Sequence, residues 1–126
     1  MVKDNPVELQ VDARQIEVVI DGVKIASTRQ PVLLFEGKLP TRYYIPRQDV
    51  RMDLLQRSDT VTYCPYKGTT ETFSVRIGEK IYKDYAWSYP NPIPHCQKIA
   101  GFICFYNEHV DIYNDGQLLG RPTAKD

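Results

Sequence analysis

The chain has 126 residues, which is enough for one hydrophobic core and too few for two independent ones. It carries 16 Lys and Arg residues against 16 Asp and Glu residues, so its formal net charge is zero. A neutral chain lacks the bulk positive charge that drives binding to nucleic acids or to anionic membranes. We therefore expect a single globular domain with neither a nucleic acid nor a membrane as partner.

The N-terminal segment and the cysteines bear on the cellular compartment. Residues 1–10 are polar and lack an apolar stretch, so they have the pattern of neither a signal peptide nor an anchor. Cys64, Cys96 and Cys104 are an odd number, and their spacing fits neither a disulfide framework nor a CxxC pair. These features predict a cytoplasmic protein with free thiols.

Short strands dominate the first third of the chain. Residues 17–20 and 23–26 alternate in polarity and flank Asp21-Gly22, a pair that favours a tight hairpin because both central residues adopt positive φ. Residues 32–36 and 42–45 predict two further strands, separated by a loop that contains glycine and proline.

The pattern changes in the middle of the chain. Residues 49–56 suit one or two helical turns, and Asp49 can cap the free amides at the start. A second short helix is expected over residues 94–100. Strand patterns return in five segments, of which the second and third form a predicted hairpin: residues 60–64, 72–77, 81–88, 102–106 and 110–113.

These elements predict an all-β, mostly antiparallel domain, either a small sandwich or an incompletely closed barrel, with one or two short helices. We place an N-terminal arm at residues 1–16 and the single β domain at residues 17–118. Residues 119–126 are expected to form a frayed C-terminal tail.

The usual signatures of cofactor and metal binding are missing from the sequence. The seven glycines are scattered through turns and form neither a GxGxxG nor a Walker pattern. There is no HExxH or CxxC motif, and a strand would point the neighbouring His95 and Cys96 side chains to opposite faces. We therefore expect no metal and no cofactor.

The first of three polar and aromatic segments spans residues 42–52. In a strand, Arg42, Tyr44 and Pro46 share one face and can line a site for an anionic ligand. The alternative is a surface ladder of ion pairs among the charged residues up to Asp53, which would contribute little stability. Arg42 stands beside tyrosines rather than carboxylates, so we expect it to lie outside such a ladder.

The second segment, residues 64–68, reads Cys-Pro-Tyr-Lys-Gly. The proline turns the chain after a strand, and Gly68 allows a close-approach geometry that leaves Tyr66 and Lys67 displayed at the strand end. A ligand contact and a solvated surface position are both open for Lys67. Cys64 is either an inert, buried thiol or a reactive one.

The third segment spans residues 85–94. Tyr85, Trp87 and Tyr89 alternate, so their rings would line one face of a strand, and three prolines at every second position then form a stiff arm. An ordinary core face is the alternative for Trp87, whereas the tyrosine hydroxyls favour the rim of a pocket. We expect all three segments to converge on one pocket.

These segments also carry a family resemblance. The motifs RYYIPR at residues 42–47, CPYKG at 64–68 and AWSYP at 86–90, followed by IAGF at 99–102, are similar to those of the DUF427 family, over about residues 17–116. The resemblance implies a compact β-tent fold, as in Mss4-like proteins, in a family without an established activity. Many Mss4-like proteins hold zinc between paired CxxC motifs, which this chain lacks, so no structural zinc is implied.

The favoured function is small-molecule binding, with an aromatic wall and cations that fix an anionic or carbonyl-bearing group of the ligand. The candidate ligand-binding residues are Arg42, Tyr44, Tyr66, Lys67, Trp87 and Tyr89.

Two other functions remain open. The first is a hydrolase or transferase with Cys64 as nucleophile, Lys67 or Arg42 stabilising negative charge, and His95 or His109 as base. The other is a protein-interaction or homo-oligomeric scaffold, for which an exposed aromatic face would be required.

Overall fold

The computed structural model describes residues 5–123, and this part of the chain is an all-β domain, as predicted. Its strands form a large sheet, a small sheet and a two-stranded ribbon, and every strand pair is antiparallel. The large sheet has the order β1 (Val7–Val11), β4 (Val32–Glu36), β5 (Arg42–Ile45), β11 (Ile103–Phe105), β10 (Lys80–Ser88), β9 (Glu71–Ile77) and β6 (Leu55–Arg57).

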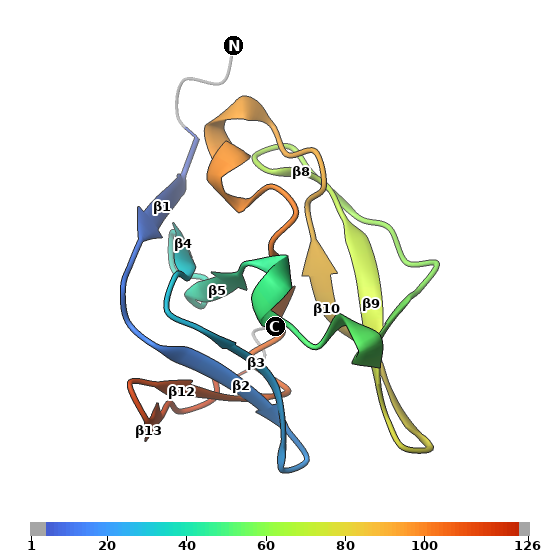
Figure 1. Ribbon diagram of the computed structural model, residues 1–126. Coiled ribbons are helices and arrows are strands. Elements are labelled where there is room, and N and C mark those ends of the chain that lie inside the picture. The colour runs from blue at the N-terminus through green and yellow to red at the C-terminus, as the bar shows by residue number, and fades with distance from the viewer. Residues whose placement is uncertain (1–4, 124–126) are drawn as a thin grey trace.

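The small sheet packs against one face of the large sheet. Its order is β13 (Gln117–Leu118), β12 (Asp111–Asn114), β2 (Ile16–Ile20) and β3 (Val23–Thr28). The ribbon pairs β7 (Tyr63–Cys64) with β8 (Gly68–Thr69). In Figure 1 the small sheet lies at the lower left, and the long β9–β10 hairpin runs down the right side.

Helix is confined to three short 3-10 pieces: η1 (Arg47–Asp49), η2 (Met52–Leu54) and η3 (Pro94–Ile99). Within residues 5–123, no helix is long and apolar enough to cross a membrane. Both predicted hairpins are present. In the β2–β3 turn, Asp21 has φ 52° and Gly22 has φ 79°, the positive values that the Asp-Gly pair predicts.

The one or two helical turns predicted over residues 49–56 are present, but the last two residues of that range form a strand instead. The chain makes two separate 3-10 turns and then enters β6, where Leu55 pairs with Val75 at the edge of the large sheet. Asp49 caps neither turn, because its carboxylate accepts a hydrogen bond from the Thr28 hydroxyl at 2.7 Å. Pairing with β9 therefore overrides the helical spacing of the apolar residues.

Strand β1 was not predicted, since we had placed its residues in an N-terminal arm. It pairs with β4 along its whole length, and Val7 is buried at 2% exposure. The predicted arm and the predicted C-terminal tail also include residues 1–4 and 124–126, which lie outside the described residues.

The centre of the large sheet is buried on both faces. Between the two sheets lies an inter-sheet core, built from residues such as Ile16, Ile25, Ile103 and Phe105. A second core covers the opposite face of the large sheet: Val7, Val32, Leu34, Tyr44, Trp87, Tyr89, Cys96, Ile99 and Cys104. Any pocket framed by the predicted aromatic residues therefore belongs to this second face.

Phe105 provides a test of the inter-sheet core. It is 2% exposed, so replacing it with alanine leaves a cavity, and we expect Phe105→Ala to lower the free energy of unfolding by about 3–5 kcal/mol. Tyr63 is 71% exposed, and Tyr63→Ala serves as the control with little expected effect. Chemical denaturation measures both changes. A loss below about 1 kcal/mol at Phe105 would contradict this packing.

Candidate functional site

The second face of the large sheet is not completely filled, and a cavity of about 230 Å³ remains. We call it the central cavity. Its wall combines aromatic, charged and hydroxyl-bearing side chains: Leu34, Glu36, Leu39, Pro40, Arg42, Tyr44, Thr60, Thr62, Lys67, Thr70, Thr72, Asp84, Trp87, Tyr89 and Tyr106. Five of the six predicted ligand-binding residues thus line one cavity; Tyr66 does not.

Strand register explains why these residues meet. One row of paired positions crosses four neighbouring strand pairs, joining Val32 to Tyr44, Tyr44 to Cys104, Cys104 to Trp87, and Trp87 to Thr72. Directly paired residues point to the same side of a sheet, so the whole row projects onto the second face. Alternation along each strand sends their neighbours, Ala86 and Phe105 among them, into the inter-sheet core.

The aromatic wall is fixed by contacts among its members. The Trp87 indole Nε1 donates a hydrogen bond of 3.0 Å to the Tyr44 hydroxyl, and the two rings meet edge to face. Burial raises the pKa of Tyr44 well above its ordinary value, so this hydroxyl stays protonated. Tyr106 packs on the other side of Trp87, with ring centroids 4.4 Å apart. The wall is therefore rigid without a ligand.

Arg42 lies over the Trp87 and Tyr106 rings, 5.3 and 5.5 Å from their centroids. It lies outside the ion pair of Arg51 with Asp53, as expected, but it has a carboxylate partner far away in the sequence. Its guanidinium donates two hydrogen bonds to Glu108, at 2.7 and 3.1 Å, and one to Asn107 at 2.6 Å. Burial alone would raise the pKa of Glu108, but the bonds from Arg42 outweigh it and keep that pKa below its ordinary value.

Lys67 enters the cavity from the turn after β7. The turn is closed by a hydrogen bond from the Lys67 amide to the Cys64 carbonyl, 3.1 Å long. The ammonium group forms an ion pair with Glu36 at the end of β4, and both side chains are only 15% exposed. Lys67 is thus a partly buried, paired cation rather than a solvated surface residue.

The proline-rich arm and the Lys67 turn are in direct contact. The Ile93 amide donates a hydrogen bond of 2.9 Å to the Lys67 carbonyl, and Figure 1 shows β8 beside the chain that follows β10. A Cβ atom on Gly68 would lie 3.2 Å from the Pro92 Cα. Only glycine permits this approach together with a φ of 129°.

Two predicted aromatic positions lie elsewhere. Tyr66 packs against the second core, and its backbone carbonyl accepts a hydrogen bond from Asn5. Tyr85 packs against the inter-sheet core and stacks on His109, so it does not continue the row of Trp87 and Tyr89. The register of β10 shifts between Tyr82 and Ala86, and this bulge breaks the simple alternation.

The structure gives no catalytic pair for Cys64. Within residues 5–123, no hydrogen bond joins this thiol to either histidine. The His95 ring nitrogen Nε2 is bonded to the Val7 carbonyl at 2.7 Å, and His109 stacks on Tyr85. Across the same described residues, no three His, Cys, Asp or Glu side chains gather as a metal site.

The residues that sequence analysis missed are the acidic and hydroxyl-bearing ones. Glu36 and Asp84 line the cavity but lie outside the three motifs, and four threonines come from the segment around β7 and β8. One signal was present for Asp84, because an aspartate in the middle of a long strand is disfavoured and suggests a bulge.

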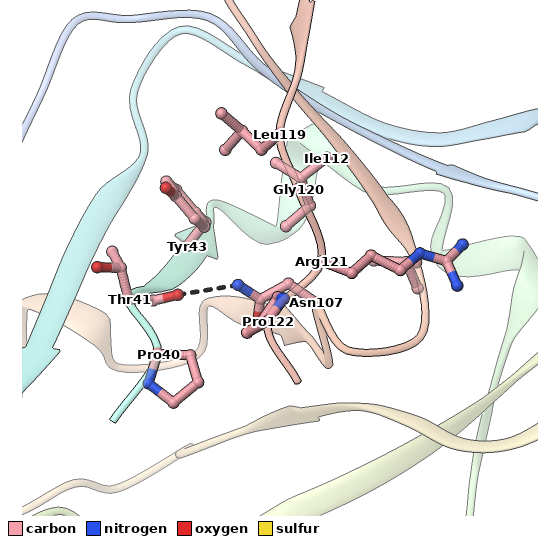
Figure 2. A pocket seen from close by; sticks show the side chains of 10 residues that line it. Pro40, Thr41, Tyr43, Asn107, Ile112, Leu119, Gly120, Arg121 and Pro122 are labelled. Carbon is pink, nitrogen blue, oxygen red and sulfur yellow. Dashed lines mark hydrogen bonds between the residues drawn. The ribbon is translucent and has the colours of Figure 1, made fainter. Parts of the chain in front are cut away.

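A second cavity, of about 310 Å³, opens between Tyr43 and the C-terminal segment (Figure 2). Its wall is mostly uncharged, and the one charged member, Arg121, extends away and pairs with Asp111. Asn107 crosses its floor to bond the Thr41 carbonyl at 3.0 Å. Among residues 5–123, it therefore has no charged group directed inward that would fix a small ligand.

A comparison with protein families now identifies the chain's relatives. The sequence profile of a domain of unknown function, DUF427, matches residues 8–116. The chain belongs to the DUF427 family. The resemblance inferred from the motifs is confirmed, and the matched range contains all the strands of the large sheet that line the central cavity. No curated protein matches the chain.

The contact at Gly68 can be tested in this DUF427 domain. We expect Gly68→Ala to cost about 1–3 kcal/mol of stability, because the new Cβ forces Pro92 to move and the backbone φ is strained. Gly78→Ala is the matched control, since Gly78 has φ 62° and no neighbour within 4 Å. Equal losses in thermal or chemical unfolding would show that the close approach contributes nothing.

The buried thiols allow a second test. Burial raises the pKa of Cys104 to about 12 and also raises that of Cys96. Iodoacetamide near neutral pH should therefore modify neither thiol in the native DUF427 domain, and both after unfolding in guanidinium chloride. Peptide mass spectrometry identifies which cysteines are modified. Rapid native modification of Cys104 would contradict its burial.

Proposed function

We propose that this DUF427 member binds a small molecule bearing a carbonyl or carboxylate group in the central cavity. The single observation that supports this most is that two cations, Arg42 and Lys67, share one cavity with a fixed aromatic wall. Sites of this composition are typical for small ligands, since the rings supply contact area and a few polar groups set the orientation.

The size of the cavity limits the ligand. Its 230 Å³ corresponds to roughly eight water molecules at about 30 Å³ each. This is below the range of about 300–1,000 Å³ that is usual for drug-sized ligands. The ligand is therefore a compact metabolite rather than a nucleotide or a peptide.

The polar groups favour an acceptor on the ligand. Within residues 5–123, the Tyr89 and Tyr106 hydroxyls have no hydrogen-bond partner, and burial keeps both protonated by raising their pKa values. Lys67 has further N–H donors beyond the one bonded to Glu36. Because both cations already have carboxylate partners, a neutral carbonyl or a single carboxylate fits better than a multiply charged anion.

The enzyme alternative has less support than binding. Cys64 is outside the central cavity, and a nucleophile needs a base within hydrogen-bond reach. The scaffold alternative requires an exposed aromatic face, whereas Trp87 and Tyr89 are 8% and 5% exposed.

Trp87 is the only tryptophan and reports directly on the cavity. We expect a library of small polar metabolites to contain carbonyl- or carboxylate-bearing compounds that change its fluorescence. The double variant Glu36→Gln/Lys67→Met removes both charges without leaving one unpaired. It should lower the affinity for such compounds about ten- to hundredfold.

The matched control is Glu17→Gln/Lys24→Met, which removes an ion pair of the small sheet. It should leave the affinities unchanged. Equal effects of the two double variants, or a library without any compound that alters Trp87 fluorescence, would refute binding in this cavity.

A further inference from the structure

Asp84 has an unusual backbone conformation for its place in the chain. It lies inside β10 with φ 56°, at the shift of register between Tyr82 and Ala86. The other aspartates with positive φ, Asp21 and Asp115, lie in hairpin turns, where this conformation is required. Strained residues inside a strand persist only where the surrounding structure holds them, and they are frequent at binding sites.

The bulge directs Asp84 onto the second face. Its backbone amide donates a hydrogen bond of 3.0 Å to the Ser74 hydroxyl, and its Oδ2 accepts one of 2.7 Å from Thr60. The nearby Ser58 and Thr60 hydroxyls lower its pKa, so the carboxylate is ionised at neutral pH. Asp84 is thus a fixed negative charge in the cavity wall.

The second carboxylate oxygen is unpaired. Oδ1 of Asp84 is buried and has no hydrogen-bond partner within residues 5–123. A buried, ionised oxygen without a donor is costly, and buried polar groups in native proteins nearly always have partners. The carboxylate therefore has an unused acceptor for a donor from a ligand or from water.

The charges of the cavity indicate what that partner is. Arg42 is paired with Glu108 and Lys67 with Glu36, so the positive and negative charges of each pair cancel. Asp84 is left as one negative charge in excess. Its carboxylate therefore favours a positively charged donor over a neutral one.

We propose that the Asp84 carboxylate accepts a hydrogen bond from an amino group of the ligand. This inference rests on the proposed function and narrows its ligand to a small zwitterion. Along β10, Asp84 precedes Trp87 and Tyr89, and the Lys67 turn contacts the arm that follows Tyr89. The amino group thus lies at the Asp84 end, and the carboxylate or carbonyl lies at the Lys67 end.

A zwitterion series and its half-molecules test the assignment. The probes are β-alanine, 4-aminobutanoate and 6-aminohexanoate, with butanoate lacking the amino group and butylamine lacking the carboxylate. We expect at least one zwitterion to change Trp87 fluorescence at concentrations about tenfold or more below either half-molecule. Butanoate binding as tightly as the best zwitterion would overturn the inference.

The variant Asp84→Asn keeps the shape of the side chain and tolerates positive φ. It should lower the affinity for the best zwitterion about ten- to hundredfold and leave the affinity for butanoate unchanged. Asp21→Asn is the matched control, because Asp21 has φ 52° and does not line the central cavity. Should Asp84→Asn fold poorly, Asp84→Gly relieves the backbone strain and also removes the carboxylate.

The remaining outcomes separate this inference from the proposed function. Unchanged zwitterion affinity in a folded Asp84 variant overturns the inference, as does a fluorescence response to calcium chloride alone that competes with the zwitterion. The inference is also overturned if none of the zwitterions changes Trp87 fluorescence. The proposed function is then judged separately by the metabolite library, where a ligand without an amino group would still support it.

Discussion

The structure depends on burial of the large sheet on both faces. Strands β5 and β11 and the last three residues of β10 send alternate side chains into two different cores, and none of these positions is exposed. The inter-sheet core is mostly aliphatic and is filled by the small sheet. The second face is covered by loops, short helices and the ribbon, which do not fill it. The central cavity is the space that remains between the aromatic row and this irregular cover.

Charged groups can line this space because most are already paired. The Arg42–Glu108 and Lys67–Glu36 pairs are partly buried, and removing one partner from such a pair would leave an uncompensated charge. These pairs hold the cations in place before a ligand arrives, which lowers the entropy lost on binding. Asp84 is the exception, since its Oδ1 has no partner among the described residues.

Short-range signals in the sequence predicted the strands and part of the site. The Asp21-Gly22 turn, the alternation from Arg42 to Ile45 and the close approach at Gly68 all follow from neighbouring residues. The partners of the cations could not be predicted, because Glu36 and Glu108 are 31 and 66 residues away from Lys67 and Arg42. The bulge at Asp84 was also missed, and with it the departure of Tyr85 from the aromatic row. Edge strands β1 and β6 were missed because pairing, rather than local pattern, makes them strands.

The most direct test of the central claim is the electron density of a crystal soaked with the tightest-binding zwitterion of the series. Our account predicts one molecule in the central cavity, with its amino nitrogen within hydrogen-bond distance of the Asp84 carboxylate and its carboxylate beside Lys67. Density for the compound in the cavity of Figure 2, or a central cavity closed by rearrangement of the Trp87 and Tyr106 rings, would contradict it.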